Sequence, residues 1–236
     1  MEIQTRTDKG RVRPVNEDAV LHFTAEPYEI ILLADGLGGH RAGEVASRMV
    51  VENMRDYLLQ HDLNNMPQVL KDAVTYANEQ VHRCQQEDAN YAGMGSTLVA
   101  AIANENAVHI AHVGDSRAYL CNEDGLVQLT IDHSVSNDIR NSGQVNENLR
   151  HMLTRAMGTE PTIHADFQKI ERQPGSILLL CSDALTNEMT TKEINEVLCG
   201  EGTLAEKADT LIATANENGG RDNITLALCM RKGETA

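Results

Sequence analysis

The stretch YEIILLADG, residues 28–36, is a short apolar run that stops at an aspartate followed by a glycine. A run rich in Ile and Leu, bounded by turn-forming residues, is typical of a β-strand buried in the protein interior. Asp35 therefore stands at the end of a predicted interior strand, where a lone aspartate is normally a turn residue or a helix cap. The glycine that follows it allows backbone or a metal ion to approach closely.

The same pattern recurs along the chain, and the set is more informative than any one member. Asp115 follows HIAHVG and Asp183 follows SILLLCS, whereas Asp18 precedes AVLHF and Asp222 precedes NITLALC. If these strand ends converge, the carboxylates repel one another and need divalent cations to stay ionised together. Oxygen ligands without Cys or paired His select Mg²⁺ or Mn²⁺ over Zn²⁺, and two such ions can share one bridging carboxylate and a water.

The remaining segments predict an α+β fold in one domain, residues 1–236. Helix-forming residues, with apolar positions at helical spacing, predict helices over residues 42–59, 67–84, 191–199 and 203–217. Short apolar runs predict further strands over residues 96–103, 107–113, 117–121, 176–181 and 223–230. Strands outnumber helices and come in adjacent runs, which favours packed sheets flanked by helices over an alternating parallel sheet.

The net charge and the composition exclude some classes of binding partner. The formal net charge is −15 and aromatic residues make up 3% of the chain, so nucleic acid is a poor partner on both counts. A phosphate-handling site in so acidic a chain needs local positive charge from metal ions or a placed arginine. The N-terminus has no signal-like apolar stretch, and no apolar run approaches the roughly 18 residues of a membrane span. We expect a soluble, cytoplasmic monomer without membrane insertion.

The cysteines and three histidines are better explained by structure than by chemistry. The five cysteines are odd in number, widely spaced and never form CxxC, which argues against a disulfide framework or a zinc ribbon and fits a reducing compartment. Cys181 and Cys229 lie in apolar runs and are predicted to be small buried side chains. His109 and His112 are three apart on a predicted strand and should point to opposite faces. His133 is predicted to be a hydrogen-bonded imidazole in a turn.

Eight segments spread over nearly the whole chain carry a family resemblance. They are TDKGRVRPVNEDA, LADGLGGHRAGEVAS, GMGSTLVAA, AHVGDSRAYL, LTIDHS, TRAMG, LLLCSDALT and GGRDNITLAL. In this order and spacing they resemble the bacterial type 2C, metal-dependent serine/threonine protein phosphatases of the PPM family. The resemblance implies a four-layer α-β-β-α sandwich of two mainly antiparallel sheets flanked by helices. It also implies hydrolysis of phosphoserine and phosphothreonine on proteins by a metal-activated water, with no covalent phosphoenzyme.

The resemblance also implies a metal-ligand set for two Mn²⁺ or Mg²⁺ ions and a weaker third. Asp35 matches the residue that bridges the first two metals. The first site would be completed by Asp183 and Asp222, and the second by Asp18 and the backbone carbonyl of Gly36. The weaker third site of bacterial members matches Asp115 with Asp183.

Two further residues match positions that act on the substrate. Arg13 matches the arginine that binds substrate phosphate, and a planar guanidinium can hold two phosphate oxygens. His40 matches the general acid for the leaving serine or threonine oxygen, a task suited to a pKa near the working pH. Glu17 is expected to lie just outside the ligand set. The expected partners are phosphorylated proteins, including a eukaryotic-like Ser/Thr kinase.

Two departures from the family pattern stand out. Residues 182–186 read SDALT where the family usually reads SDGLT. If that position needs φ > 0, Ala184 strains the loop that holds Asp183. The segment between Gly143-Gln144 and Asn148-Leu149 is shorter than in the family, in a region that forms a flap beside the active site. The alternative function is a regulatory or binding module of the same fold with weak or lost activity, against which the intact aspartates argue.

Overall fold

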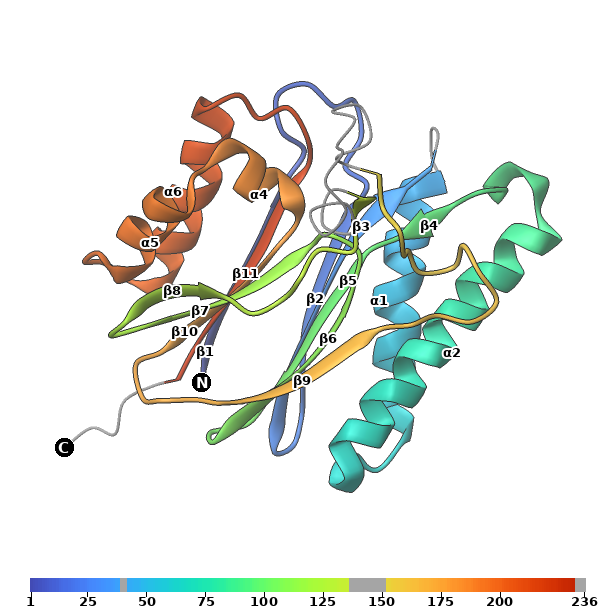
Figure 1. The fold of residues 1–236 in the computed structure, drawn as a ribbon, viewed down its shortest axis with the longest axis horizontal. Coiled ribbons are helices and arrows are strands. Elements are labelled where there is room, and N and C mark those ends of the chain that lie inside the picture. The colour runs from blue at the N-terminus through green and yellow to red at the C-terminus, as the bar shows by residue number, and fades with distance from the viewer. Residues whose placement is uncertain (39–41, 136–151, 232–236) are drawn as a thin grey trace.

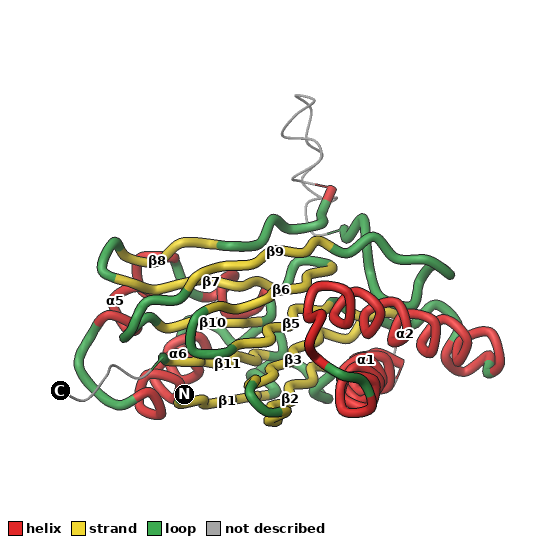
Figure 2. Tube along the Cα trace, turned by 90° about the horizontal axis from the view of Figure 1, so that it is seen from below, coloured by secondary structure: helices red, strands yellow, loops and turns green. Residues whose placement is uncertain are grey.

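The computed structural model of the chain describes residues 1–38, 42–135 and 152–231. Two β-sheets pack face to face, and helices cover the outer face of each sheet (Figure 1). Figure 2 shows the two sheets seen from below, stacked between their helices. All strand pairings between the named strands are antiparallel.

The first sheet joins the two ends of the described chain. Its order is β1-β11-β10-β7-β8. Its strands are β1 (Glu2–Asp8), β7 (Arg117–Asn122), β8 (Gly125–Gln128), β10 (Ile177–Cys181) and β11 (Ile224–Met230). The central strands β10 and β11 consist almost entirely of buried apolar residues, so this sheet is covered on both faces.

The second sheet has the order β2-β3-β5-β6-β9, with the short β4 paired to β3. Its strands are β2 (Asp18–Ala25), β3 (Tyr28–Leu37), β4 (Gly95–Ser96), β5 (Leu98–Ala103), β6 (Ala107–Val113) and β9 (Asp166–Glu171). Side chains of β3 alternate between two cores. Ile30 and Leu32 face the helices, whereas Ile31 and Leu33 face the other sheet. Burial on both faces explains the uninterrupted apolar run of this strand.

The helices form the two outer layers. The second sheet is covered by α1 (Ala42–Gln60) and α2 (Met66–Glu87), which are joined through a 3₁₀ turn, Leu63–Asn65. The first sheet is covered by α4 (Asp183–Glu188), α5 (Thr191–Cys199) and α6 (Leu204–Glu217). Capping boxes start two of these helices, Thr190 with Glu193 in α5 and Thr203 with Glu206 in α6, which satisfies backbone N–H groups at their first turns.

The α+β fold and its four-layer α-β-β-α arrangement are confirmed. The predicted helices and strands over the described residues are all present, with ends shifted by a few residues. Among the described strands and α-helices, four had no counterpart in the prediction: β1, β8, β9 and the short helix α4. None of the described helices is long and apolar enough to cross a membrane.

Candidate metal centre

The pairing of β2 with β3 places two of the predicted ligands face to face. Asp18 and Asp35 are direct cross-strand partners, an arrangement in which like charges destabilise a sheet. Burial is the largest cause of a raised pKa in both residues: the pKa of Asp18 rises to about 7, and that of Asp35 rises well above its usual range. Repulsion from the neighbouring carboxylates adds to both shifts.

The other three aspartates reach the same end of the sandwich from the first sheet and its connections. Asp183 follows β10 as the first residue of α4, and Asp222 lies two residues before β11. Asp115 lies between β6 and β7. The pKa of Asp35 is raised, after burial, by Asp18, Asp183, Asp115 and Asp222 in that order. The other four predicted aspartate ligands therefore all lie near enough to Asp35 to act on its charge.

Burial also raises the pKa of Asp115 to about 7, with Asp183 as the next cause. Asp183 additionally accepts a hydrogen bond at Oδ2 from Nδ2 of Asn187, one turn further along α4, at 2.9 Å. This bond restrains the carboxylate, because it holds one of its two oxygens against the helix.

Buried oxygens without partners indicate that this region needs a cation or water. Oε1 of Glu17 and Oδ1 of Asp18 are buried and accept no hydrogen bond from the part of the chain that the structure describes. A buried acceptor without a donor costs its full desolvation penalty. Within the described ranges, no three acidic, His or Cys side chains already surround one point as metal ligands do. The carboxylates thus fit hard divalent cations by their chemistry and their unmet charge.

Glycines bring the backbones of β3 and α1 together beside this cluster. The N–H of Gly36 donates to the carbonyl oxygen of Glu17 at 3.1 Å. A Cβ at Gly36 would collide with the carbonyl group of Gly43 in α1, and a Cβ at Gly43 would lie 2.5 Å from Oε1 of Glu17. The glycine after Asp35 is therefore required by helix-to-strand packing, and it leaves the Gly36 carbonyl next to the acidic residues.

Hydroxyl side chains that the sequence-based interpretation left without a role hold the aspartates in place. The N–H of Asp35 donates to Oγ1 of Thr97 at 2.9 Å, and Thr97 shares a hydrogen bond of 2.6 Å with Oγ of Ser116. Oγ of Ser182 donates to Oδ2 of Asp18 at 3.0 Å and so links the two sheets. Thr97, Ser116 and Ser182 lie inside the segments GMGSTLVAA, AHVGDSRAYL and LLLCSDALT, respectively. Their place in these family-like segments is the sequence signal that could have identified them.

Arg117 ties β7 to the elements around Asp115 and Asp183. Its Nη2 lies 2.6 Å from Oδ2 of Asp132, its Nε lies 2.9 Å from Oδ1 of the same carboxylate, and its Nη1 donates to Oγ1 of Thr186 at 2.8 Å. Such a bidentate pair is geometrically specific. The arginine therefore braces the loop after β8 and helix α4 against the sheet.

Arg13 lies at the edge of the cluster. Its Nη2 donates to Oδ2 of Asp222 at 2.7 Å, and both side chains are close to half exposed. The guanidinium is also near enough to Glu17 and Asp35 for their charges to raise its pKa further, after the hydrogen bond with Asp222. Arg13 is thus a solvent-accessible cation beside the acidic residues.

The remaining predicted residues have mixed outcomes. His40 and the shortened segment 143–149 lie outside the described residues. His133 is hydrogen-bonded as predicted, since its Nδ1 accepts from the N–H of Gly114 at 3.2 Å, but it lies in irregular chain after β8 and not in a turn. His109 is partly exposed whereas His112 is buried, in keeping with opposite faces of β6. Ala184 lies within the first turn of α4, where φ is negative, so the suggested strain at this position is wrong.

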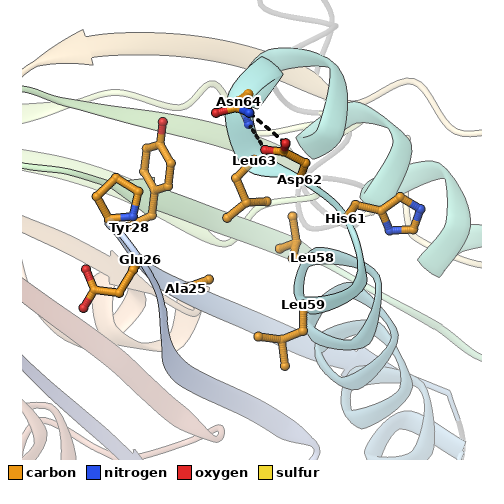
Figure 3. A pocket seen from close by; sticks show the side chains of 10 residues that line it. Ala25, Glu26, Tyr28, Leu58, Leu59, His61, Asp62, Leu63 and Asn64 are labelled. Carbon is orange, nitrogen blue, oxygen red and sulfur yellow. Dashed lines mark hydrogen bonds between the residues drawn. The ribbon is translucent and has the colours of Figure 1, made fainter.

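Two cavities of about 360 Å³ differ in their relation to the acidic residues. One lies between the β2–β3 hairpin and the α1–α2 connection and is lined by side chains such as Tyr28, Leu58 and Asn64 (Figure 3). The hairpin turn is at the far end of the two strands from Asp18 and Asp35, so this cavity is not part of the cluster. The other is lined by Ala184, Asn187, Glu188, Arg221 and Asp222, and it borders the cluster directly.

Comparisons with known proteins agree with this geometry. Residues 10–229 match the family model of Protein phosphatase 2C. The chain is 38% identical to the serine/threonine phosphatase stp of Listeria innocua, with 100% of both chains covered. It is 37% identical to the protein phosphatase PhpP of Streptococcus pneumoniae, again over 100% of both.

Solved structures give the same result. The serine/threonine phosphatase Stp1 from Staphylococcus aureus superposes with a TM-score of 0.91 at 35% identity, covering 98% of this chain and 95% of that one. The catalytic domain of the serine threonine protein phosphatase PstP, in complex with two manganese ions, gives a TM-score of 0.85 at 31% identity and 96% coverage of each chain.

The helical position of Ala184 predicts that Ala184→Gly lowers stability without improving metal use. Glycine in a helix is destabilising by roughly 0.5–1 kcal/mol relative to alanine, and the buried methyl group is lost as well. We expect a lower melting temperature and an unchanged Mn²⁺ concentration for half-maximal activity. Ala205→Gly, at the equivalent position in the first turn of α6, is the matched control. A reduced Mn²⁺ requirement in the Ala184 variant alone would restore the strain hypothesis.

The raised pKa of Asp18 predicts a pH-dependent gain of stability in Asp18→Asn without metal. The pKa of Asp18 is about 7 in the folded state, above its value in the unfolded chain. Between these two pKa values, Asp18 is protonated in the folded state and ionised in the unfolded state, so the stability of wild type falls as pH rises between them. Asn does not titrate. The stability advantage of the variant should therefore grow by about 2–3 kcal/mol between about pH 5 and pH 8.

The measurement is urea unfolding in EDTA at each pH, with wild type and variant side by side. Asp124→Asn, at an exposed turn position between β7 and β8, serves as the control and should show no pH-dependent difference from wild type. An advantage of Asp18→Asn that is the same at both ends of the pH range would contradict the prediction.

Proposed function

The chain belongs to the protein phosphatase 2C family, and we propose that its clustered aspartates hold the metal ions with which it removes phosphate from proteins. The activity is that of a protein serine/threonine phosphatase: it hydrolyses phosphoserine and phosphothreonine with a metal-activated water and no covalent phosphoenzyme. The alternative, a regulatory or binding module with lost activity, is not favoured, because the relatives over the full length are named phosphatases.

One observation carries the site assignment: Asp18 and Asp35 are cross-strand partners, and Asp115, Asp183 and Asp222 lie near enough to Asp35 for their charges to raise its pKa. A protein of net charge −15 gains no stability from collecting buried like charges. Cations reverse that balance, because they neutralise the carboxylates and add favourable charge pairs. The unpartnered oxygens of Glu17 and Asp18 support the same conclusion.

Each residue in the proposed centre has a distinct task. Bound divalent cations supply Lewis acidity, which lowers the pKa of water and offsets the charge of the phosphate. We assign Asp35 the bridging position between two ions, with Asp183 and Asp222 on one side. Asp18 and the carbonyl of Gly36 serve the other side. This assignment rests on the family resemblance and is supported by the mutual influence of these charges.

A weaker third site is assigned to Asp115 together with Asp183. Its support is the electrostatic coupling between them, since Asp183 is the largest cause after burial of the raised pKa of Asp115. Either Mn²⁺ or Mg²⁺ suits such an all-oxygen ligand set, and the neighbouring PstP structure contains manganese.

Arg13 is proposed to hold the substrate phosphate. Its side chain is 47% exposed and its guanidinium already binds one carboxylate oxygen, Oδ2 of Asp222. A planar fork of N–H donors matches phosphate oxygens as well as carboxylate oxygens. In a strongly acidic chain, this arginine provides positive charge that attracts a phosphoprotein to the site.

His40 is proposed as the general acid that protonates the leaving serine or threonine oxygen. The assignment comes from the segment LADGLGGHRAGEVAS alone. The physiological setting proposed with it is a cytoplasmic, monomeric, single-domain enzyme acting on phosphoproteins, among them a eukaryotic-like Ser/Thr kinase.

Asp35→Asn should abolish turnover while leaving the fold intact. The loss should exceed about 100-fold, because removing even an outer partner of a metal ligand costs about 10–100-fold. Phosphate release from p-nitrophenyl phosphate with and without Mn²⁺ measures activity. Thermal melts give a second readout, since Mn²⁺ should raise the melting temperature of wild type but not of the variant.

Asp183→Asn should behave in the same way, and Asp124→Asn is the control that should match wild type in both measurements. Activity within a few-fold of wild type at saturating Mn²⁺ in either active-site variant would refute the metal assignment.

Arg13→Ala should act mainly on substrate binding. Loss of a charge-assisted hydrogen bond costs about 1.5–3 kcal/mol, so we expect KM for a phosphopeptide to rise by about 10–100-fold with kcat little changed. Arg13→Lys keeps the positive charge but loses the planar pair of N–H donors. Its KM should lie between those of wild type and Arg13→Ala. Arg11→Ala, an exposed neighbour, is the control. An unchanged KM in Arg13→Ala would remove this residue from the phosphate site.

A further inference from the structure

Two cysteines that are far apart in the sequence meet on the outer face of the first sheet. The Sγ atoms of Cys121 and Cys199 lie 3.0 Å apart, although 78 positions separate them along the chain. Cys121 is in β7 and Cys199 is the last residue of α5. A disulfide has an S–S length of about 2.05 Å, so the two sulfurs need to approach by only about 1 Å to form the bond.

The two thiols differ in their surroundings as a reactive and a resolving cysteine would. Cys199 is exposed and Cys121 is buried. Both line a surface cavity of about 360 Å³ between the β7–β8 turn and residues 173–177, which gives a small oxidant access to the pair. Burial, followed by the contact with Cys199, raises the pKa of Cys121 to about 12, so the buried sulfur remains a thiol while the exposed one meets solvent.

A lysine supplies positive charge next to the pair. Nζ of Lys207 in α6 donates to the carbonyl oxygens of Val197, at 3.2 Å, and Gly200, which flank Cys199 at the end of α5. Its charge also works against the raised pKa of Cys121.

We infer that Cys121 and Cys199 form an intramolecular disulfide when the protein meets a peroxide, which makes this pair a site of reversible oxidation. The thiolate of Cys199 attacks one peroxide oxygen, the O–O bond breaks, and Cys199 becomes a sulfenic acid as hydroxide leaves. The sulfur of Cys121 then attacks the sulfur of Cys199, the S–O bond breaks, and the oxygen leaves as water. Two electrons pass from the two sulfurs to one peroxide.

The disulfide forms far from the proposed metal centre. In the pairing of β10 with β7, Cys121 lies opposite Ile177 whereas Arg117 lies opposite Cys181, two residues before Asp183. The thiol pair is thus at the other end of these strands from the aspartates. The bond would fasten α5 to the sheet and limit the unfolded chain, so it should change stability and leave turnover unchanged.

The experiment treats the reduced, metal-loaded, full-length protein with hydrogen peroxide and then alkylates it with N-ethylmaleimide under denaturing conditions. Three of the five cysteines should take up the reagent, and peptide mapping should find Cys121 linked to Cys199. Dithiothreitol should restore all five. The oxidised protein should melt about 4–15 °C higher than the reduced protein, with unchanged phosphatase activity.

Two variants separate this pair from general oxidation. Cys199→Ser removes the exposed thiol and should give no disulfide and no rise in melting temperature. Cys84→Ser, on α2 and on the other side of the molecule, is the matched control and should behave like wild type. The inference is overturned if all five thiols of wild type remain alkylatable, if Cys199 is oxidised further while Cys121 stays free, or if the link joins two chains.

Discussion

Asp18 and Asp35 face one another across two adjacent strands, and this contact between like charges governs the end of the sandwich around it. Burial and the neighbouring carboxylates both raise the cost of ionising these residues. Such a cluster persists only where the surrounding structure is rigid enough to hold it. Hydrogen bonds made by the Thr97 and Ser182 hydroxyls provide that rigidity, together with the bidentate ion pair between Arg117 and Asp132.

The layers beneath explain how the carboxylates can be placed so accurately. Strand β3 sends alternate side chains into two separate cores, one shared with the helices and one shared with the other sheet. A strand buried on both faces cannot slip by one residue without exchanging every side chain between the two cores. The register that sets Asp35 opposite Asp18 is therefore fixed by apolar packing along the whole strand.

Much of this could be predicted from the sequence, and the failures have physical causes. Strands such as 28–34 and 176–181 were predictable because burial on both faces leaves a continuous apolar run, and the aspartates that end them marked the site. Strand β9, DFQKIE, was missed because its side chains are mostly exposed or half-buried and polar. Helix α4 was missed because six residues are too few to show helical periodicity. The contact between Cys121 and Cys199 depends on tertiary packing alone.

The open edges of the two sheets have a consequence for how the molecule meets its own copies. An edge strand offers unpaired N–H and C=O groups on which another chain could build. Here the outer strands β1, β2 and β9 all carry charged residues, and β8 has only four residues. Charge and shortness at an edge oppose strand addition, and the net charge of −15 adds repulsion between copies of the chain. These features disfavour the joining of sheets from two molecules into one continuous sheet.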